Sequence, residues 1–169
     1  MKKIMPIVLV AALLATIAVP AMAAPPGDTI IDIAKAINEE SGEFSILILA
    51  LEAADEAVIN TLDGNGQFTV FAPTDAAFAS LLEELGISAE DLLGNQELVT
   101  QVLLYHVAHG RRYSGDILAS DRIRTLERGF LFQDGGVLTD ENGRTSNIIA
   151  IDVEAANGII HVIDTVVLP

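Results

Sequence analysis

The chain has 169 residues, no cysteine, and 24 acidic against nine basic residues, which gives a formal net charge of −15 at pH 7. The lack of cysteine excludes disulfides, thiolate metal sites and iron–sulfur clusters, so a hydrophobic core must hold the fold alone. The acidic surplus argues against nucleic acid, because that binding depends on phosphate neutralisation by Lys and Arg, and equally against anionic lipid surfaces. It favours solubility by mutual repulsion, with a cationic partner as the alternative.

The N-terminal segment has the pattern of a secretory signal. Lys2 and Lys3 supply a positive end, the run from Ile4 to Val19 is almost wholly apolar, and Ala21-Met22-Ala23 supplies the small residues of a cleavage site. The apolar run is shorter than the roughly 20 residues of a membrane-spanning helix. No cysteine follows it for lipid attachment. We therefore predict a cleavable signal over residues 1–23 and no stable membrane anchor.

Cleavage at this site leaves a short leader over residues 24–28 and one domain over 29–169, which is within the usual size of a single domain. It also removes two lysines, so the mature chain is more acidic than the whole. We expect a secreted protein. The sequence leaves open whether it stays in a periplasm or leaves the cell.

The first half of the domain shows helical periodicity. Asp28 or Thr29 can cap a helix that begins near residue 30, and Gly86 can end a helix over 78–85. Ser88 opens a further short helix. Apolar residues recur on one helical face in each stretch. The predicted helices cover 30–37, 44–51, 78–85 and 97–105, with the short one near 88–94.

The second half shows strand periodicity. A turn at 64–66 leads into a strand over 67–72, and after Gly110 the apolar residues alternate. Asn142-Gly143 and Asn157-Gly158 predict hairpin turns. The last strand is apolar on both faces, so we expect it at the centre of a sheet. Helices early and strands late indicate an α+β domain. The later candidate strands are 122–126, 129–132, 136–139, 147–153 and 158–167.

Three segments together carry a family resemblance. Residues 68–78 read FTVFAPTDAAF, residues 103–107 read LLYHV, and residues 157–169 read NGIIHVIDTVVLP. In this order and spacing they resemble the fasciclin domain, over essentially Thr29 to Pro169. The resemblance implies a small β-sandwich of about seven strands flanked by several short helices, within the usual layered α+β architecture. It also implies that the first and last segments are neighbouring central strands.

The first segment also has a reading from its residues alone. Phe71 lies in an apolar strand that runs into Pro73, which stops the strand pairing, and Thr74 or Asp75 caps a helix that carries Phe78 into the core. In the last segment, Asn157 and Gly158 turn the chain into the closing strand that holds His161 and Asp164. The resemblance implies the same structural roles.

Four residues are candidates for interaction. In animal members of the family, the tyrosine–histidine segment and Asp-Ile motifs have been linked to integrin-dependent adhesion, and this chain has Tyr105-His106 and Asp116-Ile117. The alternative is that Tyr105 and His106 end a helix and fix it to the sandwich by packing and hydrogen bonds. The bacterial-type signal argues against an integrin partner, so adhesion would have another target.

The sequence lacks the pattern of an enzyme. His106 and His109 could share one side of a helix end, but zinc needs a third ligand, and His161 lies in a predicted buried strand. No nucleophile elbow, P-loop or dinucleotide-binding motif is present. The stretch 140–143 fits a hairpin tip better than a calcium loop. We expect no catalysis, metal or cofactor.

The sequence therefore predicts a secreted, non-catalytic binding module for adhesion or for contact with a matrix or cell surface. Its partner would be an unidentified protein or polysaccharide, reached through the domain surface. Two alternatives stay open. One is a carrier of a small apolar ligand, such as a lipid or sterol, held between sandwich and helices. The other, and the weakest, is an extracellular hydrolase.

Overall fold

The computed structural model describes residues 27–169. The predicted signal and residues 24–26 of the predicted leader lie outside the described residues. The described helices are α1 (Ile30–Ser41), α2 (Ser45–Ala53), α3 (Glu56–Leu62), α4 (Asp75–Leu85), α5 (Ala89–Leu93), α6 (Gln96–Tyr105) and α7 (Ser114–Leu118). The described strands are β1 (Phe68–Pro73), β2 (Val107–His109), β3 (Arg122–Arg124), β4 (Phe130–Asp134), β5 (Val137–Thr139), β6 (Thr145–Ala155) and β7 (Gly158–Ile163).

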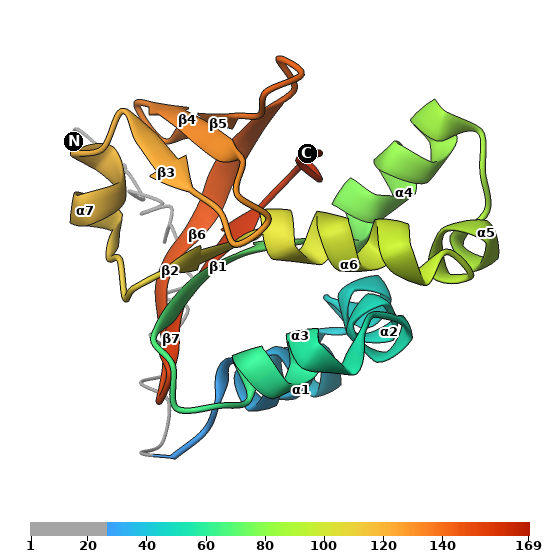
Figure 1. The fold of residues 1–169 in the computed structure, drawn as a ribbon, viewed down its shortest axis with the longest axis horizontal. Helices are drawn as coiled ribbons and strands as arrows, with labels where there is room; N and C mark the ends of the chain where they lie inside the picture. Colours follow the sequence, from blue (N-terminus) through green and yellow to red (C-terminus); the bar gives the residue numbers. More distant parts are fainter. Residues whose placement is uncertain (1–26) are drawn as a thin grey trace, which may run out of the picture.

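The strands form one strongly curved sheet in the order β2-β1-β7-β6-β5-β4-β3 (Figure 1). β1 and β7 are parallel neighbours at its centre, and the other pairs are antiparallel. β6 carries two register shifts, which bend a strand. A bridge between Ala108 and Thr125 joins the two ends of the sheet. The predicted seven-stranded α+β sandwich is confirmed, and β6 is the strand that joins its two halves.

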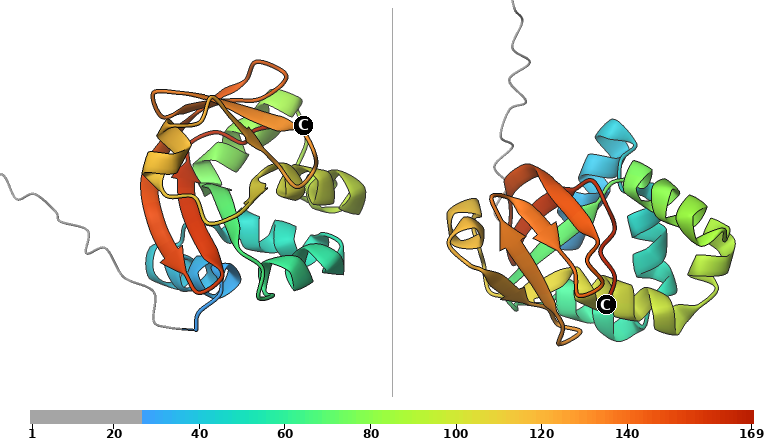
Figure 2. Two further views of the ribbon diagram at one scale, coloured as in Figure 1. Left: turned by 60° about the vertical axis from the view of Figure 1, so that its left-hand side comes forward. Right: turned by 90° about the horizontal axis from the view of Figure 1, so that it is seen from above.

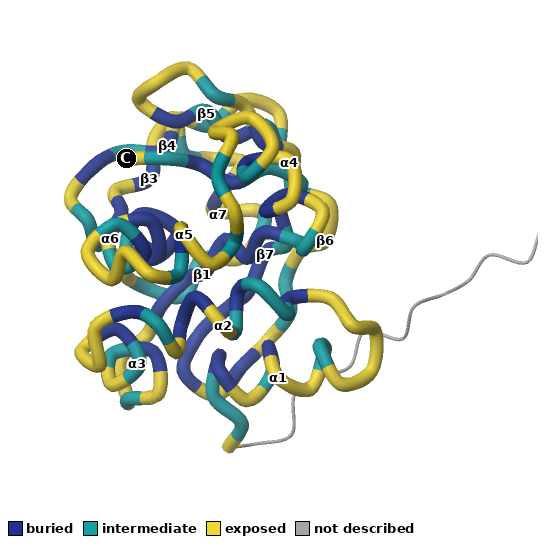
Figure 3. Tube along the Cα trace, turned by 90° about the vertical axis from the view of Figure 1, so that its right-hand side faces the viewer, coloured by how far each residue is buried: buried dark blue, intermediate teal, exposed yellow. Residues whose placement is uncertain are grey.

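Two cores hold the layers together. The larger core lies between helices α1–α6 and one face of β1 and β7, to which Val70, Ala72 and Ile160 contribute. The smaller core lies inside the curved sheet and contains Phe71 and Ile163. β1 is buried on both faces, as expected for a central strand. Figure 2 shows helices α1–α6 gathered on one side of the sheet and α7 apart from them, and Figure 3 shows β1 and β7 largely buried and the helices only partly exposed.

Local hydrogen bonds explain where the helices begin and end. Thr29 and Asp32 form a reciprocal capping box at the start of α1. Thr74 caps α4, and Gly86 ends it with a φ of 65°, a left-handed conformation that glycine adopts without steric cost. The predicted caps at these positions are confirmed. Phe44, predicted as a helical residue, instead lies just before α2 with a φ of 70°.

Three short elements were not predicted, namely α3, β2 and α7. Each is too short to show a period in the sequence. The last strand is also shorter than predicted, because it ends at Ile163. Asp164 then accepts hydrogen bonds from the backbone and side-chain nitrogens of Asn147, both at 2.8 Å. Within residues 27–169, no helix is long and apolar enough to cross a membrane.

Candidate functional site

Tyr105 lies at the end of α6, inside the curved sheet. Its side chain is fully buried. Its hydroxyl donates to the carbonyl oxygen of Phe130 at 2.7 Å and accepts from the amide of Glu141 at 3.3 Å. Burial raises the pKa of this hydroxyl to about 12. Tyr105 therefore ties α6 to strand β4 and to the loop that follows β5.

His106 follows immediately and lies between the sheet and the helices. Its Nε2 accepts from the amide of Val167 at 3.3 Å, so the proton must sit on Nδ1, which donates to the carbonyl oxygen of Val102 at 2.7 Å. Burial lowers the pKa of His106 to about 4. The imidazole is therefore neutral near pH 7, and both of its nitrogens are engaged inside the protein.

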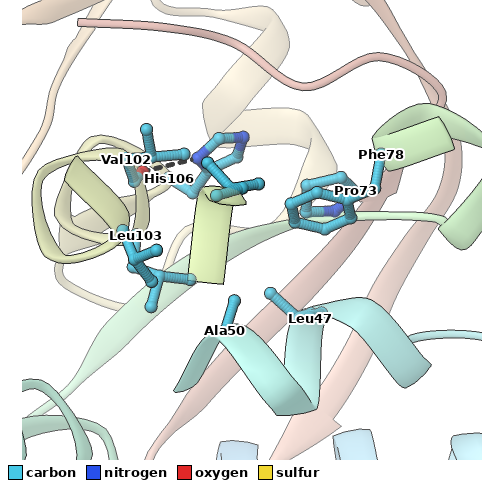
Figure 4. A pocket seen from close by; sticks show the side chains of 9 residues that line it. Leu47, Ala50, Pro73, Phe78, Val102, Leu103 and His106 are labelled. Carbon is cyan, nitrogen blue, oxygen red and sulfur yellow. Dashed lines mark hydrogen bonds between the residues drawn. The ribbon is translucent and has the colours of Figure 1, made fainter. Parts of the chain in front are cut away.

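Two small apolar cavities adjoin His106, and Figure 4 shows the one that Pro73 and Phe78 also line. One lies among α2, α4, α5 and α6 and has a volume of about 10 Å³. The other lies between α1, α2 and the central strands and has a volume of about 20 Å³. Leu47, Leu103 and His106 line both. Volumes of this size hold about one water molecule, so neither cavity has room for a lipid or sterol.

The other two histidines lie in different surroundings. His161 is fully buried in β7, where its Nε2 lies 2.9 Å from the carbonyl oxygen of Arg112. Burial lowers its pKa as well. His109 is exposed, and its ring lies 5.7 Å from that of Phe68. In the part of the chain that the structure describes, no three His, Asp or Glu side chains are placed to hold a metal ion.

The Asp-Ile motif lies on α7. Ile117 is 1% exposed and packs in the same small core as Tyr105. Asp116 is exposed and accepts a hydrogen bond from the amide of Tyr113 at 3.2 Å. The structure thus brings Tyr105 and Ile117 into one core and leaves Asp116 alone at the surface. Any role of these four residues in binding stays a prediction.

The first family segment contains a clamp that the sequence did not predict in full. Thr74 caps its own helix α4, through a bond from the amide of Ala77. Asp75 instead accepts from the amides of Ser45 at 3.1 Å and Ile46 at 2.9 Å, at the start of α2. Asp75 was predicted as an alternative cap for α4. The two caps together fix α2 and α4 to the end of β1.

The last family segment contains a second clamp. Asn157 is buried in the turn between β6 and β7. Its Oδ1 accepts from the amide of Ile30 at 2.8 Å, and its Nδ2 donates to the carbonyl oxygens of Leu62 at 2.6 Å and Gly64 at 2.9 Å. This one side chain therefore joins the start of α1 and the end of α3 to the central hairpin.

Sequence reasoning missed one buried carboxylate, Asp140. It accepts from the amides of Asn142 and Arg144, and from the amide of Leu168 at 2.9 Å. It thus closes the turn before β6 and holds the C-terminal segment. An acid two residues before a glycine-containing turn was the available signal, since such side chains bond their own backbone.

Comparison with known proteins agrees with this architecture. A family model described as the fasciclin domain matches residues 42–169. The chain belongs to the fasciclin domain family.

Relatives span bacteria and animals. Protein sll1483 of Synechocystis sp. is 37% identical over 145 residues, which cover 83% of this chain and 73% of that protein. Transforming growth factor-beta-induced protein ig-h3 of Sus scrofa is 35% identical, but the match covers 88% of this chain and only 20% of that protein. Immunogenic protein MPT70 of Mycobacterium tuberculosis is 30% identical over 75% of this chain and 64% of its own length.

A solved structure has the same fold. It is a FAS1 domain pair from the insect cell adhesion molecule fasciclin I, with a TM-score of 0.60, 23% identity, and coverage of 76% of this fasciclin chain and 46% of that one. At this identity the likeness concerns the fold alone. The present chain corresponds to one part of such longer proteins.

Proposed function

We propose that this fasciclin domain is an exported, non-catalytic binding module that contacts cell-surface or matrix material through its exterior. The observation that carries the proposal is the use of its polar interior. Within residues 27–169, every buried side-chain nitrogen or oxygen has a hydrogen-bond partner. These pairings support a structural role for Tyr105, His106 and His161, and the proposal therefore assigns contact with a partner to the surface.

Family membership supports the same proposal. The solved structure with this fold comes from a protein described as a cell adhesion molecule. The N-terminal pattern of Lys2, Lys3 and an apolar run predicts export. Recovery of the protein from the periplasmic or culture fraction, with residues 1–23 removed, is the expected result. An unprocessed protein in the cytoplasm would contradict the export part of the proposal.

Binding is tested with the purified exported protein and washed envelope or matrix material from its own source. A natively acidic protein of similar size and net charge serves as control. We expect saturable retention above that control. Retention equal to the control would contradict the proposal.

Carriage of an apolar ligand is the second candidate. Its support is the pair of adjoining apolar cavities beneath α2 and α6, which share Leu47 and Leu103. A ligand would require these helices to move apart. Native mass spectrometry of the purified protein distinguishes the two proposals. A co-purifying lipid or sterol in stoichiometric amount favours carriage, and a mass equal to that of the protein alone favours surface contact.

A further inference from the structure

Strands β3 and β4 place arginine and phenylalanine side chains on the outer surface of the sheet. Arg122 lies opposite Phe132, and Arg124 lies opposite Phe130. Directly opposed residues of an antiparallel pair share one face. The intervening pair, Ile123 and Leu131, is fully buried on the other face. Arg122, Arg124, Phe130 and Phe132 therefore form one outward patch, which we term the Arg–Phe face.

The positive charges of this face have no carboxylate partner. The ion pair found within residues 27–169 is Arg144–Glu84, and it lies elsewhere. The guanidinium of Arg122 instead lies 4.9 Å from the ring centroid of Phe130. Along β4, Phe130 and Asp134 lie on opposite sides of Phe132, the residue that Arg122 faces. The side chain of Arg122 points toward the ring of Phe130 and therefore away from the carboxylate of Asp134. Stacking thus positions a free guanidinium beside Phe132, which is 44% exposed.

The location of the face is unusual in so acidic a protein. Residues 27–105, which form β1 and helices α1–α6, carry fifteen carboxylates and one basic residue, Lys35. Residues 106–169 carry six arginines and nine carboxylates. In Figure 1, β3 and β4 lie at the upper left, away from α1–α5. Because the Debye length is about 8 Å at physiological ionic strength, most of the distant carboxylates are screened from a ligand at this face.

We propose that the Arg–Phe face binds a carboxylate-bearing polysaccharide, that is, a chain of uronate sugars. This inference rests on the proposed function, whose surface and partner class it specifies. A guanidinium matches a carboxylate by two parallel hydrogen bonds. The exposed ring of Phe132 can stack on the C–H face of a sugar ring, while the ring of Phe130 holds the guanidinium of Arg122. The face thus offers both a charge match and an apolar platform.

The position of the face in the sheet favours a polysaccharide over a peptide. An extended peptide is usually held at an open sheet edge or in a groove. The edge formed by β3 is joined to the opposite end of the sheet by the Ala108–Thr125 bridge. The two described cavities lie beneath the helices, away from β3 and β4. Two exposed cations beside an exposed ring on the face of the sheet, and not at its edge, suit a chain of charged sugar rings that lies across the strands.

The test measures retention of the exported protein on immobilised polygalacturonate. Fully methyl-esterified polygalacturonate has the same rings without charge, and poly-glutamate has the carboxylates without rings. Arg122→Ala and Arg124→Ala should each weaken binding about tenfold, in line with the loss of a charge-assisted hydrogen bond. Phe132→Ser should weaken it by a similar factor. Binding should also fall as salt rises.

Matched controls separate a local face from general charge. Lys35→Ala removes one exposed positive charge from α1, and Ile151→Ser removes an exposed apolar side chain from β6. Both should bind as the wild type does, and all five variants should keep the wild-type melting temperature because the altered side chains are exposed. Equal loss in the controls would overturn the proposal.

Comparison of the immobilised ligands identifies the class of partner. Retention on polygalacturonate alone supports the proposal. Equal retention on the methyl ester, on poly-glutamate or on polyuridylate would overturn it, since each points to a different partner chemistry. Absence of wild-type binding to polygalacturonate, together with saturable binding to envelope material, would overturn this inference and leave the proposed function standing.

Discussion

His106 links the stability of the fold to pH at the scale of a single residue. Its pKa is about 4 in the folded protein, against an ordinary value of 6.5. The unfolded chain therefore binds more protons between these values, and stability falls as pH drops from 6.5 to 4. A pKa difference of one corresponds to 1.36 kcal/mol, so the free energy of unfolding lost through His106 is about 3 kcal/mol.

Urea unfolding of the wild type and of His106→Asn at several pH values measures this loss. The pKa values of His161 and of the carboxyls of Asp32, Asp91 and Asp164 are lowered as well, so these groups also reduce the stability of the protein in acid. The difference between the two profiles isolates His106. It should shrink by about 3 kcal/mol between pH 7 and pH 4, whereas parallel profiles would contradict the neutral, buried imidazole.

Tyr105 and His106 can be assigned to fold or to binding by paired measurements on variants. Tyr105→Phe leaves the carbonyl of Phe130 without its partner and should cost about 1–3 kcal/mol. His106→Ala and Phe78→Ala should each cost on the order of 2–4 kcal/mol through lost packing and polar pairing. Folded variants should still bind the partner. Unchanged stability with lost binding would instead favour the interaction role of His106.

At the scale of elements, Asp75 should couple two helices. Its carboxylate accepts from the amides of Ser45 and Ile46, so Asp75→Ala should destabilise the protein by about 1–2 kcal/mol, as for the loss of a helix cap. Hydrogen exchange at the start of α2 should become faster at the same time. Glu83→Ala, an exposed change within α4, is the control and should alter neither quantity.

Gly158 should tolerate no side chain, because β1 approaches it closely. An added Cβ would lie 2.2 Å from the carbonyl oxygen of Phe68 and 2.6 Å from Cδ1 of Ile30. Gly158→Ala should therefore cost about 1–3 kcal/mol or more through overpacking. Gly115→Ala in α7 meets nothing within 4 Å and should be nearly neutral. Equal melting temperatures for the two variants would contradict the parallel packing of β1 on β7.

The sequence predicts those elements whose own residues carry a complete signal. The helices with a full apolar stripe and a cap, and the hairpin turn at Asn142-Gly143, lie where they are predicted. The clamp formed by Asp75 was not predicted, because its partners Ser45 and Ile46 lie 30 and 29 residues away in the sequence and leave no local pattern. The side-by-side placement of β1 and β7 came from the family resemblance, because pairing between distant strands leaves no local pattern.

At the scale of the whole molecule, the polar interior supports the fold, which agrees with our proposal that contact uses the exterior. In the described part of the chain, residues 27–169, the buried polar side-chain groups are paired, and the two described cavities are too small for a lipid. Charge is distributed unevenly over the surface, with the helical half strongly acidic and most arginines within residues 111–128. A partner that docks on one side of the molecule is the arrangement that this distribution favours.

The most direct test of this account is a binding isotherm of the exported, purified protein on washed envelope or matrix material from its own source. Wild type and folded Tyr105→Phe should show the same saturable binding, above that of an acidic control protein of similar size. Binding no greater than that of the control, or binding lost in the folded Tyr105→Phe variant, would contradict a module that acts through its exterior.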